Sequence, residues 1–475
     1  MNKFLSLFFA LTSITSLYGG EELILDGDYP VTVDSGSTEV ISRKVTGSGR
    51  LILHGGGMLV LNNAENDFTG GIVVSNGIVR ADASGAFGTG TISLEGDNPL
   101  RQVRFNALNG VFQNSIMLCT VGTVEKVIYI EKDVELNGDI TLHQDYADSK
   151  NYLLCYAQDA ATRTTINGNI DVSHLQFIGN GTFVCNGKMK VSTQLIAGAG
   201  GKDYYGTLTL SNSNNEISVL QIVAFKIQCK QENVLYKSGI YFNYGGRGNS
   251  SSYCCIYLNG YNQTFKFLKY NTANEYGKIS RHNSCVRITT DSDKPATVIL
   301  AGPGSAYGYC RLSGPVSVVV DKSQDAQSLY QRFLYRENSM SGNFTVNNGS
   351  CYFMDGVTFP NVTNMVIAGG ITYVSNVTNL CPKLEKWTIQ GGTVTFQDGC
   401  VNAIGPKTKL YLSSQAKLYC YDGITNTVRN LYLDGKKMSA GIYNYENLAP
   451  MKPNSGTYNG ALVVTHGSSL GIVVR

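Results

Sequence analysis

The chain has 475 residues and a formal net charge of +3, and only 15% of its residues are charged, while glycine alone contributes 53. Helical enzymes carry many charged residues on their exposed faces, and average globular proteins contain about 25% of them, so this composition argues against a helical enzyme. The 43% hydrophobic content excludes a disordered chain, and the near-neutral charge gives no sign of nucleic-acid binding.

Residues 1–19 have the pattern of a secretory signal peptide. Lys3 supplies a positive charge, residues 4–17 are largely apolar, and the small Gly19 lies near the expected cleavage point. We therefore expect a secreted or bacterial cell-surface protein, with the periplasm as an open alternative. No later window reaches eighteen apolar residues, so contact with a membrane is expected to be peripheral at most.

Short β-type segments recur along the rest of the chain. Each one places alternating or β-branched apolar residues after a turn glycine, which is the pattern of a strand. They include residues 49–53, 57–61, 71–74, 77–81, 90–94, 206–210, 370–374, 392–396 and 409–412. The best helix candidate is residues 325–337, about three turns of a loop helix.

The 41 asparagines and the glycine surplus favour a parallel β-helix, because each coil needs corner residues that tolerate left-handed backbone. We predict an all-β fold, a right-handed single-stranded parallel β-helix (solenoid) over residues 20–430. It would have about 18 to 22 coils and a length on the order of 90 to 100 Å. Pairs such as Asn76-Gly77 leave an antiparallel sandwich open, above all as an insert within residues 100–340, where the repeat is faintest.

Residues 46–95 carry the strongest repeat. The stretch contains a Gly-x-Gly-x-Leu-x-Leu strand, an Asn-x-Phe-Thr-Gly-Gly element, an Asn-Gly turn and an Ala-Phe-Gly turn. The matching residues are Gly47, Gly49, Leu51, Leu53, Asn66, Phe68, Thr69, Gly70, Gly71, Val73, Val74, Asn76, Gly77 and residues 86–90. This stretch resembles the autotransporter-associated β-strand repeat of bacterial secreted and outer-surface proteins, and the resemblance implies a parallel β-helix in an exported bacterial protein.

The side chains of the same stretch also fit a parallel β-helix. Leu51, Leu53, Val73 and Val79 would point inward. Asn66 and Thr69 would hydrogen-bond backbone groups at a corner, and the Gly70-Gly71 pair would adopt backbone angles that other residues avoid.

Residues 431–475 resemble the closing segment of similar bacterial repeat proteins, with an LxLDGxxxxAGxY strand pair and a final GxLxV strand. We expect these capping strands to cover the open end of the solenoid, which would otherwise expose unpaired backbone. A translocating barrel needs at least eight strands. The segment has room for only a few, so the expectation is a passenger-type protein without an autotransporter barrel.

Twelve cysteines allow two interpretations in an exported chain, up to six disulfides or small hydrophobes stacked in the core, and the second is slightly favoured. No CxxC pair exists, so a zinc knuckle is unsupported. The cysteines are at positions 119, 155, 185, 229, 254, 255, 285, 310, 351, 381, 400 and 420.

Candidate chemistry is sparse. The five histidines form no HExxH motif, and the acidic pairs are interpreted as solvated turn residues, with calcium at Asp291 and Asp293 as a minor alternative. The other acidic residues considered are Asp26, Asp28, Asp145, Asp148 and Asp203. We therefore assign no catalytic, cofactor-binding or metal-binding residue and expect no cofactor.

Tyrosines cluster along the sequence, where they could stack on sugar rings or stabilise strands. The clusters are Tyr204-Tyr205, Tyr236-Tyr241-Tyr244, Tyr253-Tyr257-Tyr261, Tyr307-Tyr309 and Tyr443-Tyr445. The sequence thus predicts a non-enzymatic, adhesion-type surface protein whose partners are glycans or cell-surface and matrix proteins. The alternative is a polysaccharide lyase or hydrolase with a groove on the solenoid.

Overall fold

The structure is a computed structural model that describes residues 14–16, 21–96, 101–119, 125–144, 152–157, 159–199, 205–242, 254–270, 286–291, 293–303, 306–308, 310–322, 330–333, 338–452 and 458–466. It divides into two compact units, residues 1–227 and 228–475. The described strands form a β-solenoid with about 16 parallel stacked coils, which confirms the predicted fold class. Within the described residues, the helical content consists of short 3₁₀ turns such as Ala449–Met451.

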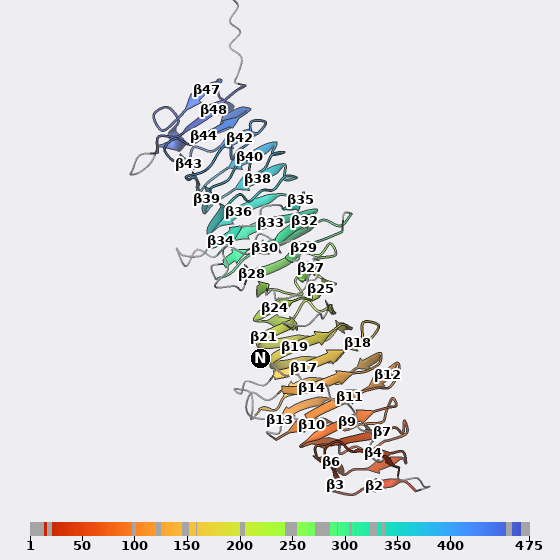
Figure 1. Cartoon of the computed structure of the whole chain (residues 1–475). Coiled ribbons are helices and arrows are strands. Elements are labelled where there is room, and N and C mark those ends of the chain that lie inside the picture. Colours follow the sequence, from red (N-terminus) through yellow and green to blue (C-terminus); the bar gives the residue numbers. More distant parts are fainter. Residues whose placement is uncertain are drawn as a thin grey trace, which may run out of the picture. The chain divides into compact units, whose positions relative to one another are not determined.

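In unit 1 the strands of successive coils pair in parallel and build three stacks, and Figure 1 shows them lying one above another. The first stack contains β3 (Asp28–Val33), β6 (Arg50–Gly55), β8 (Ile72–Val74), β10 (Ile92–Glu95), β13 (Ile116–Cys119), β16 (Ile140–Leu142), β19 (Ile170–Gly179), β21 (Met189–Gly198) and β23 (Glu216–Ile217). The second contains β1 (Ile14–Ser16), β4 (Thr38–Ile41), β7 (Met58–Leu61), β9 (Gly77–Ala81), β11 (Arg101–Phe105), β14 (Glu125–Ile130), β17 (Tyr152–Ala157), the long strands β19 and β21, and β24 (Val219–Val223). The third contains β12 (Gly110–Phe112), β15 (Val134–Leu136), β18 (Arg163–Ile166), β20 (Thr182–Cys185) and β22 (Thr207–Leu210), while β2 (Leu23–Leu25) pairs with β5 (Val45–Gly47).

Unit 2 repeats the same plan, and β25 (Lys226–Cys229) spans the boundary between the units in sequence. One stack contains β26 (Ser238–Phe242), β28 (Gln263–Tyr270), β30 (Ala296–Leu300), β33 (Val316–Asp321), β36 (Phe344–Asn348), β38 (Asn364–Ile367), β40 (Lys386–Ile389), β42 (Lys409–Leu412) and β45 (Asn430–Leu433). A second contains β27 (Cys254–Tyr257), β29 (Val286–Thr289), β32 (Arg311–Gly314) and β35 (Ser339–Met340). A third contains β31 (Ala306–Gly308), β34 (Tyr330–Phe333), β37 (Ser350–Met354), β39 (Ile371–Ser375), β41 (Thr393–Phe396) and β43 (Lys417–Cys420).

The parallel pairing corrects two expectations. The described strands within residues 100–340 pair in parallel, so the antiparallel sandwich considered for that stretch is wrong. The helix expected at residues 325–337 is also wrong where the structure describes it, because Tyr330–Phe333 is a strand that pairs with β37. The alternation of a buried Gln331 and Phe333 with the half-buried Arg332 fits a strand and not a helix.

Coil length varies more than the sequence repeat suggested, and this explains why about 16 coils are present instead of 18 to 22. The chain advances 19 residues from Asn169 to its stacked partner Lys188, but 35 residues from Asn262 to Thr297. Strands of coils with such different lengths still pair in parallel, for example β28 with β30.

The corners explain the surplus of glycine and asparagine. Six of the ten described non-glycine residues with positive φ are asparagines, and among the others are Asp355 and Asp434. Short polar side chains tolerate this left-handed conformation because they hydrogen-bond locally.

The 46–95 repeat is built as expected, with two differences. Val73 pairs in register with the half-buried Ile52, so it lies on the outer side of its strand, between the inward Ile72 and Val74. Leu51 and Leu53 are fully buried, and Asn66 joins neighbouring coils, because its Oδ1 accepts from the N–H of Val45 and its Nδ2 donates to the carbonyl of Ala86. Gly71 has a φ of +87°, as expected. Gly70 is required for a different reason, since a Cβ there would lie 2.2 Å from the carbonyl oxygen of Gly49 in the coil below.

Cysteine is used here as a small core residue. The eleven described cysteines are all free, and all except the half-buried Cys119 are buried. The favoured interpretation, stacked free cysteines, is therefore confirmed for these eleven, while Cys285 lies outside the described residues.

The C-terminal strands change the pairing direction and form the predicted cap. β46 (Lys436–Lys437) folds back antiparallel on β45, and β47 (Gly441–Tyr443) pairs antiparallel with β48 (Ala461–Val464). β48 also pairs in parallel with β44 (Thr425–Val428). At the other end, β1 lies within the predicted signal peptide and pairs with β4; the signal peptide itself and the predicted domain boundaries stay predictions.

Candidate binding site

A column of large polar side chains follows the second stack of unit 1. Arg80 in β9, Arg104 in β11, Tyr129 in β14 and Tyr156 in β17 occupy matching register positions in four successive coils. Neighbouring strands lie about 4.8 Å apart, so each of these residues lies beside the next one in the column.

The arginines of this column are neutralised by carboxylates. Arg80 forms a two-pronged pair with Asp82, with distances of 2.6 and 3.1 Å, and its Nε lies 3.9 Å from Glu131. Arg104 lies 3.6 Å from Glu131 and also donates two hydrogen bonds to Gln102. Glu131 is therefore held between two guanidinium groups that come from two different coils.

Tyr129 is packed from both directions along the column. The Arg104 guanidinium lies over its ring at 4.8 Å from the centroid, a cation–π contact. On the other side its ring lies 4.8 Å from that of Tyr156 with an interplanar angle of 50°. These contacts fix the orientation of the half-buried ring and turn part of it toward solvent.

An open hollow of about 530 Å³ lies beside this ring. We call it the Tyr129 hollow, and it is lined by Tyr129, Ile130, Glu131, Asp159, Ala160 and Asn180. Its rim is built by turns: Asp159 Oδ1 accepts from the N–H of Ala161 at 2.9 Å, and Asn180 Oδ1 accepts from the N–H of Tyr205 at 2.9 Å. A ring, two carboxylates and an amide therefore face one concave surface.

Sequence reasoning missed this site entirely. Its residues come from three coils of unequal length, so no fixed spacing along the chain marks them. A register alignment of the coils would have placed Arg104, Tyr129 and Tyr156 in one column, and that alignment is the only signal that the sequence contains.

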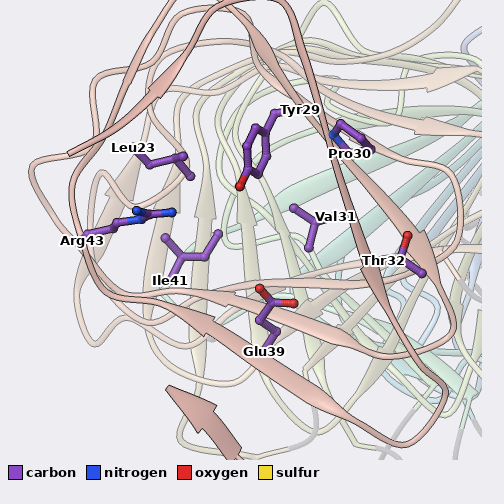
Figure 2. A pocket seen from close by; sticks show the side chains of 8 residues that line it. All are labelled: Leu23, Tyr29, Pro30, Val31, Thr32, Glu39, Ile41 and Arg43. Carbon is purple, nitrogen blue, oxygen red and sulfur yellow. The ribbon is translucent and has the colours of Figure 1, made fainter. Parts of the chain in front are cut away.

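A second, smaller hollow of about 190 Å³ lies at the first coil, and Figure 2 shows its side chains around one opening. β2 and β3 pair here with β5 and β6, so this is where the described stacks begin. The lining consists of Leu23, Tyr29, Pro30, Val31, Thr32, Glu39, Ile41 and Arg43. Leu23, Val31 and Ile41 are core residues, so this hollow is the end of the hydrophobic interior and not a chemical site.

In unit 2 the outward tyrosines stack on one another. The rings of Tyr411 and Tyr432 lie 4.5 Å apart at an angle of 7°, and those of Tyr352 and Tyr373 lie 4.7 Å apart at 19°. Each ring covers the face of its neighbour in the next coil, which supports the strand-stabilising interpretation for these residues.

Two tyrosines of the sequence clusters contact residues of the neighbouring coil. Tyr241 packs against Phe267 at 5.3 Å, and Tyr257 accepts a hydrogen bond from Arg287 at 2.7 Å. Tyr204, Tyr244, Tyr253 and Tyr309 lie outside the described residues.

The acidic residues considered from the sequence are turn and surface residues where the structure describes them. Asp28 pairs with Arg50 at 2.7 Å, and Asp291 pairs with Lys294 at 3.6 Å across an exposed turn. Asp145, Asp148 and Asp203 lie outside the described residues. In the part of the chain that the structure describes, no three His, Cys, Asp or Glu side chains are grouped to hold a metal ion.

A search for helices long and apolar enough to cross a membrane finds none among the described residues. No family model and no solved structure matches the chain. The chain is 46% identical over 61 residues to a protein named Adhesin BmaC autotransporter from Brucella suis biovar 1 (strain 1330). The match covers 13% of this chain and 2% of that protein, so the chain spans a very small part of its relative. The partial likeness and the β-solenoid fit an autotransporter-type passenger and a secreted or surface protein of the adhesion type.

Proposed function

We propose that the chain is an exported, adhesion-type β-solenoid without catalytic activity, which attaches to surface glycans or matrix proteins through residues repeated on its outer faces. The observation that carries this proposal is the likeness to an adhesin over 61 residues in a chain whose fold is a parallel solenoid. In such a fold a side chain recurs at the same position in the next coil, about 4.8 Å away.

This geometry favours binding through many modest contacts. A partner with its own repeat, such as a polysaccharide or a fibrous protein, can engage several coils at once, and the summed avidity exceeds that of each contact. The column from Arg80 to Tyr156 offers charged and aromatic groups in adjacent coils.

The experiment is a binding panel with the purified chain. The chain is coupled to beads at high and low density and applied to a glycan array and to immobilised matrix proteins. Saturable binding that strengthens more than tenfold at high density supports the proposal, because multivalent display amplifies weak contacts. Absence of binding to every glycan and matrix protein on the panel contradicts it.

The same preparation tests the rival enzymatic function. Glu131 and Asp159 line one hollow, and paired carboxylates are the groups that glycoside hydrolysis requires. Release of new reducing ends from neutral or acidic polysaccharides, lost in an Asp159→Asn variant, would favour an enzyme over an adhesin.

A further inference from the structure

We propose that the Tyr129 hollow is a binding subsite for an uncharged sugar unit of a glycan. The proposal rests on the proposed function and names one site and one ligand class for it. It is carried by a concave surface, a ring held in a fixed orientation, hydrogen-bonding groups of both kinds, and the charge of the surrounding side chains.

The size of the hollow fits a small ligand. Its volume of about 530 Å³ lies within the range of small-molecule sites, about 300 to 1,000 Å³. It is open on one side, so an internal unit of a longer chain can enter while its neighbours stay in solvent.

The polar groups match the hydroxyls of a sugar ring. Glu131 and Asp159 supply carboxylate oxygens, which accept hydrogen bonds. Asn180 lines the hollow, and its Oδ1 accepts from the N–H of Tyr205, so the Nδ2 of the same amide is the donor that this side chain can offer. Sugar hydroxyls both donate and accept, so vicinal hydroxyls can satisfy a carboxylate and an amide together.

Tyr129 supplies the apolar part of the surface. Arg104 and Tyr156 hold its ring from both sides, so little conformational entropy is lost when a ligand packs against it. The C–H groups of a pyranose can contact the exposed part of this ring while the hydroxyls reach Asp159 and Asn180.

The charge of the lining disfavours an acidic ligand, because the hollow is lined by two carboxylates, Glu131 and Asp159, and by no described lysine or arginine. Arg80 and Arg104 belong to the neighbouring column, and both are already paired with Asp82 and Glu131. Asp159 forms no ion pair with any described residue, so its carboxylate adds negative charge at the rim. A carboxylated or sulfated sugar would meet this charge, whereas a neutral sugar would not.

The test compares neutral and anionic oligosaccharides on the full chain. The neutral probes are gluco-, manno- and galacto-hexaoses, and the anionic probe is hexa-galacturonate, each titrated by calorimetry. We expect saturable binding of at least one neutral probe and at least tenfold weaker binding of the anionic one.

Three variants locate the site. Tyr129→Ala should weaken binding of the neutral probe at least tenfold, and Tyr129→Phe, which keeps the ring and its packing, should stay within threefold of wild type. Asp159→Asn keeps an oxygen that can accept from Ala161, so it should fold normally and weaken binding about threefold to tenfold. Asp133→Asn is the matched control, because Asp133 also caps a backbone N–H, that of Arg163, but does not line the hollow.

The outcomes separate this proposal from the proposed function. Neutral-probe binding that is unchanged in Tyr129→Ala and Asp159→Asn overturns the subsite while leaving adhesion intact. Preferred binding of hexa-galacturonate overturns the ligand class. A chain that binds no probe and no member of the matrix panel overturns the subsite and the adhesion function together.

Discussion

The side-chain amide of Asn186 donates to the side-chain oxygen of Asn167 at 2.8 Å, one coil away, and Asn167 in turn donates to Asn137 at 2.8 Å. The three asparagines form a ladder along a corner of unit 1 that links three coils. The amide of Asn167 accepts from one neighbouring coil and donates to the other, so the ladder adds hydrogen bonds between coils beyond those of the strands.

Asn167→Ala should lower the free energy of unfolding by about 1–2 kcal/mol, because three exposed hydrogen bonds between coils are lost, to Asn137, Glu135 and Asn186, and each contributes about 0.5 kcal/mol or slightly more. Urea unfolding followed by circular dichroism measures the change. Asn62→Ala is the control, since Asn62 is an exposed asparagine of the same unit outside the ladder, and it should change stability by less than about 0.5 kcal/mol. Equal effects of the two variants would show that the ladder adds nothing.

A glycine column follows the same corner. A Cβ on Gly168 would lie 2.0 Å from the carbonyl oxygen of Gly138, and a Cβ on Gly187 would lie 2.1 Å from that of Gly168. Gly168→Ala should therefore destabilise unit 1 by about 2–4 kcal/mol, through crowding between coils. The measurement is again the free energy of unfolding.

A substitution at Gly36 distinguishes the effect of steric crowding from the effect of backbone strain. The φ of this glycine is +81° and nothing lies within 4 Å of the place that a Cβ would occupy, so Gly36→Ala should cost only about 1–2 kcal/mol through its left-handed backbone. A larger loss from Gly36→Ala than from Gly168→Ala would contradict the steric account.

The buried thiols should resist modification in the native protein. Burial raises the pKa of the Cys185 and Cys310 thiols to about 12 and that of the half-buried Cys119 to about 11, so very little thiolate is present at pH 8. In a Cys285→Ser variant, a thiol-reactive chromophore should label at most one cysteine quickly at pH 8. After unfolding in guanidinium it should label all eleven; fast native labelling of several thiols would contradict their burial.

The same thiols make stability depend on alkaline pH. A thiol whose pKa is raised in the folded state contributes its full stability below the unfolded pKa of about 9, and this contribution is lost as the pH rises toward the folded value. Well above pH 9, each such thiol lowers the free energy of unfolding by about 1.4 kcal/mol for each pH unit. Burial lowers the pKa of Lys322 to about 8, so this lysine alone would make the free energy of unfolding rise as the pH increases above 8. It is one group, and the several buried thiols act in the opposite direction.

Unfolding free energies at pH 7.5, 9 and 10 should therefore fall steeply above pH 9. Cys185→Ala removes one titrating group, so its loss between pH 9 and pH 10 should be smaller than that of wild type by about 1 kcal/mol, because the unfolded thiol is already half ionised at pH 9. Identical slopes in the two proteins would show that Cys185 ionises as readily when folded as when unfolded.

Local patterns were sufficient to predict the solenoid but not the site. The inward positions of Leu51 and Leu53 follow from alternation, and the corner role of Asn66 follows from its place between two strands. These features depend on neighbours within one coil. Tyr129 and Asp159 lie together only because of the pairing between coils, and the coils differ in length, so no fixed spacing along the sequence reveals which residues are paired.

The tyrosines illustrate the same limit. Tyr411 and Tyr432 belong to none of the clusters noted in the sequence, yet their rings stack because they are paired in register in neighbouring coils. The strand-to-strand register sets which rings meet, and clustering along the chain does not reveal it.

Because a strand inside a stack pairs in parallel with a strand of the coil on either side, the chain can change its length in whole coils. In unit 2, β38 pairs with β36 on one side and with β40 on the other, and β39 pairs in the same way with β37 and β41. An in-frame duplication of the segment between matching points of two coils would insert a layer whose strands find the same partners above and below. Gene rearrangement could thus lengthen or shorten this protein one layer at a time without designing a new core.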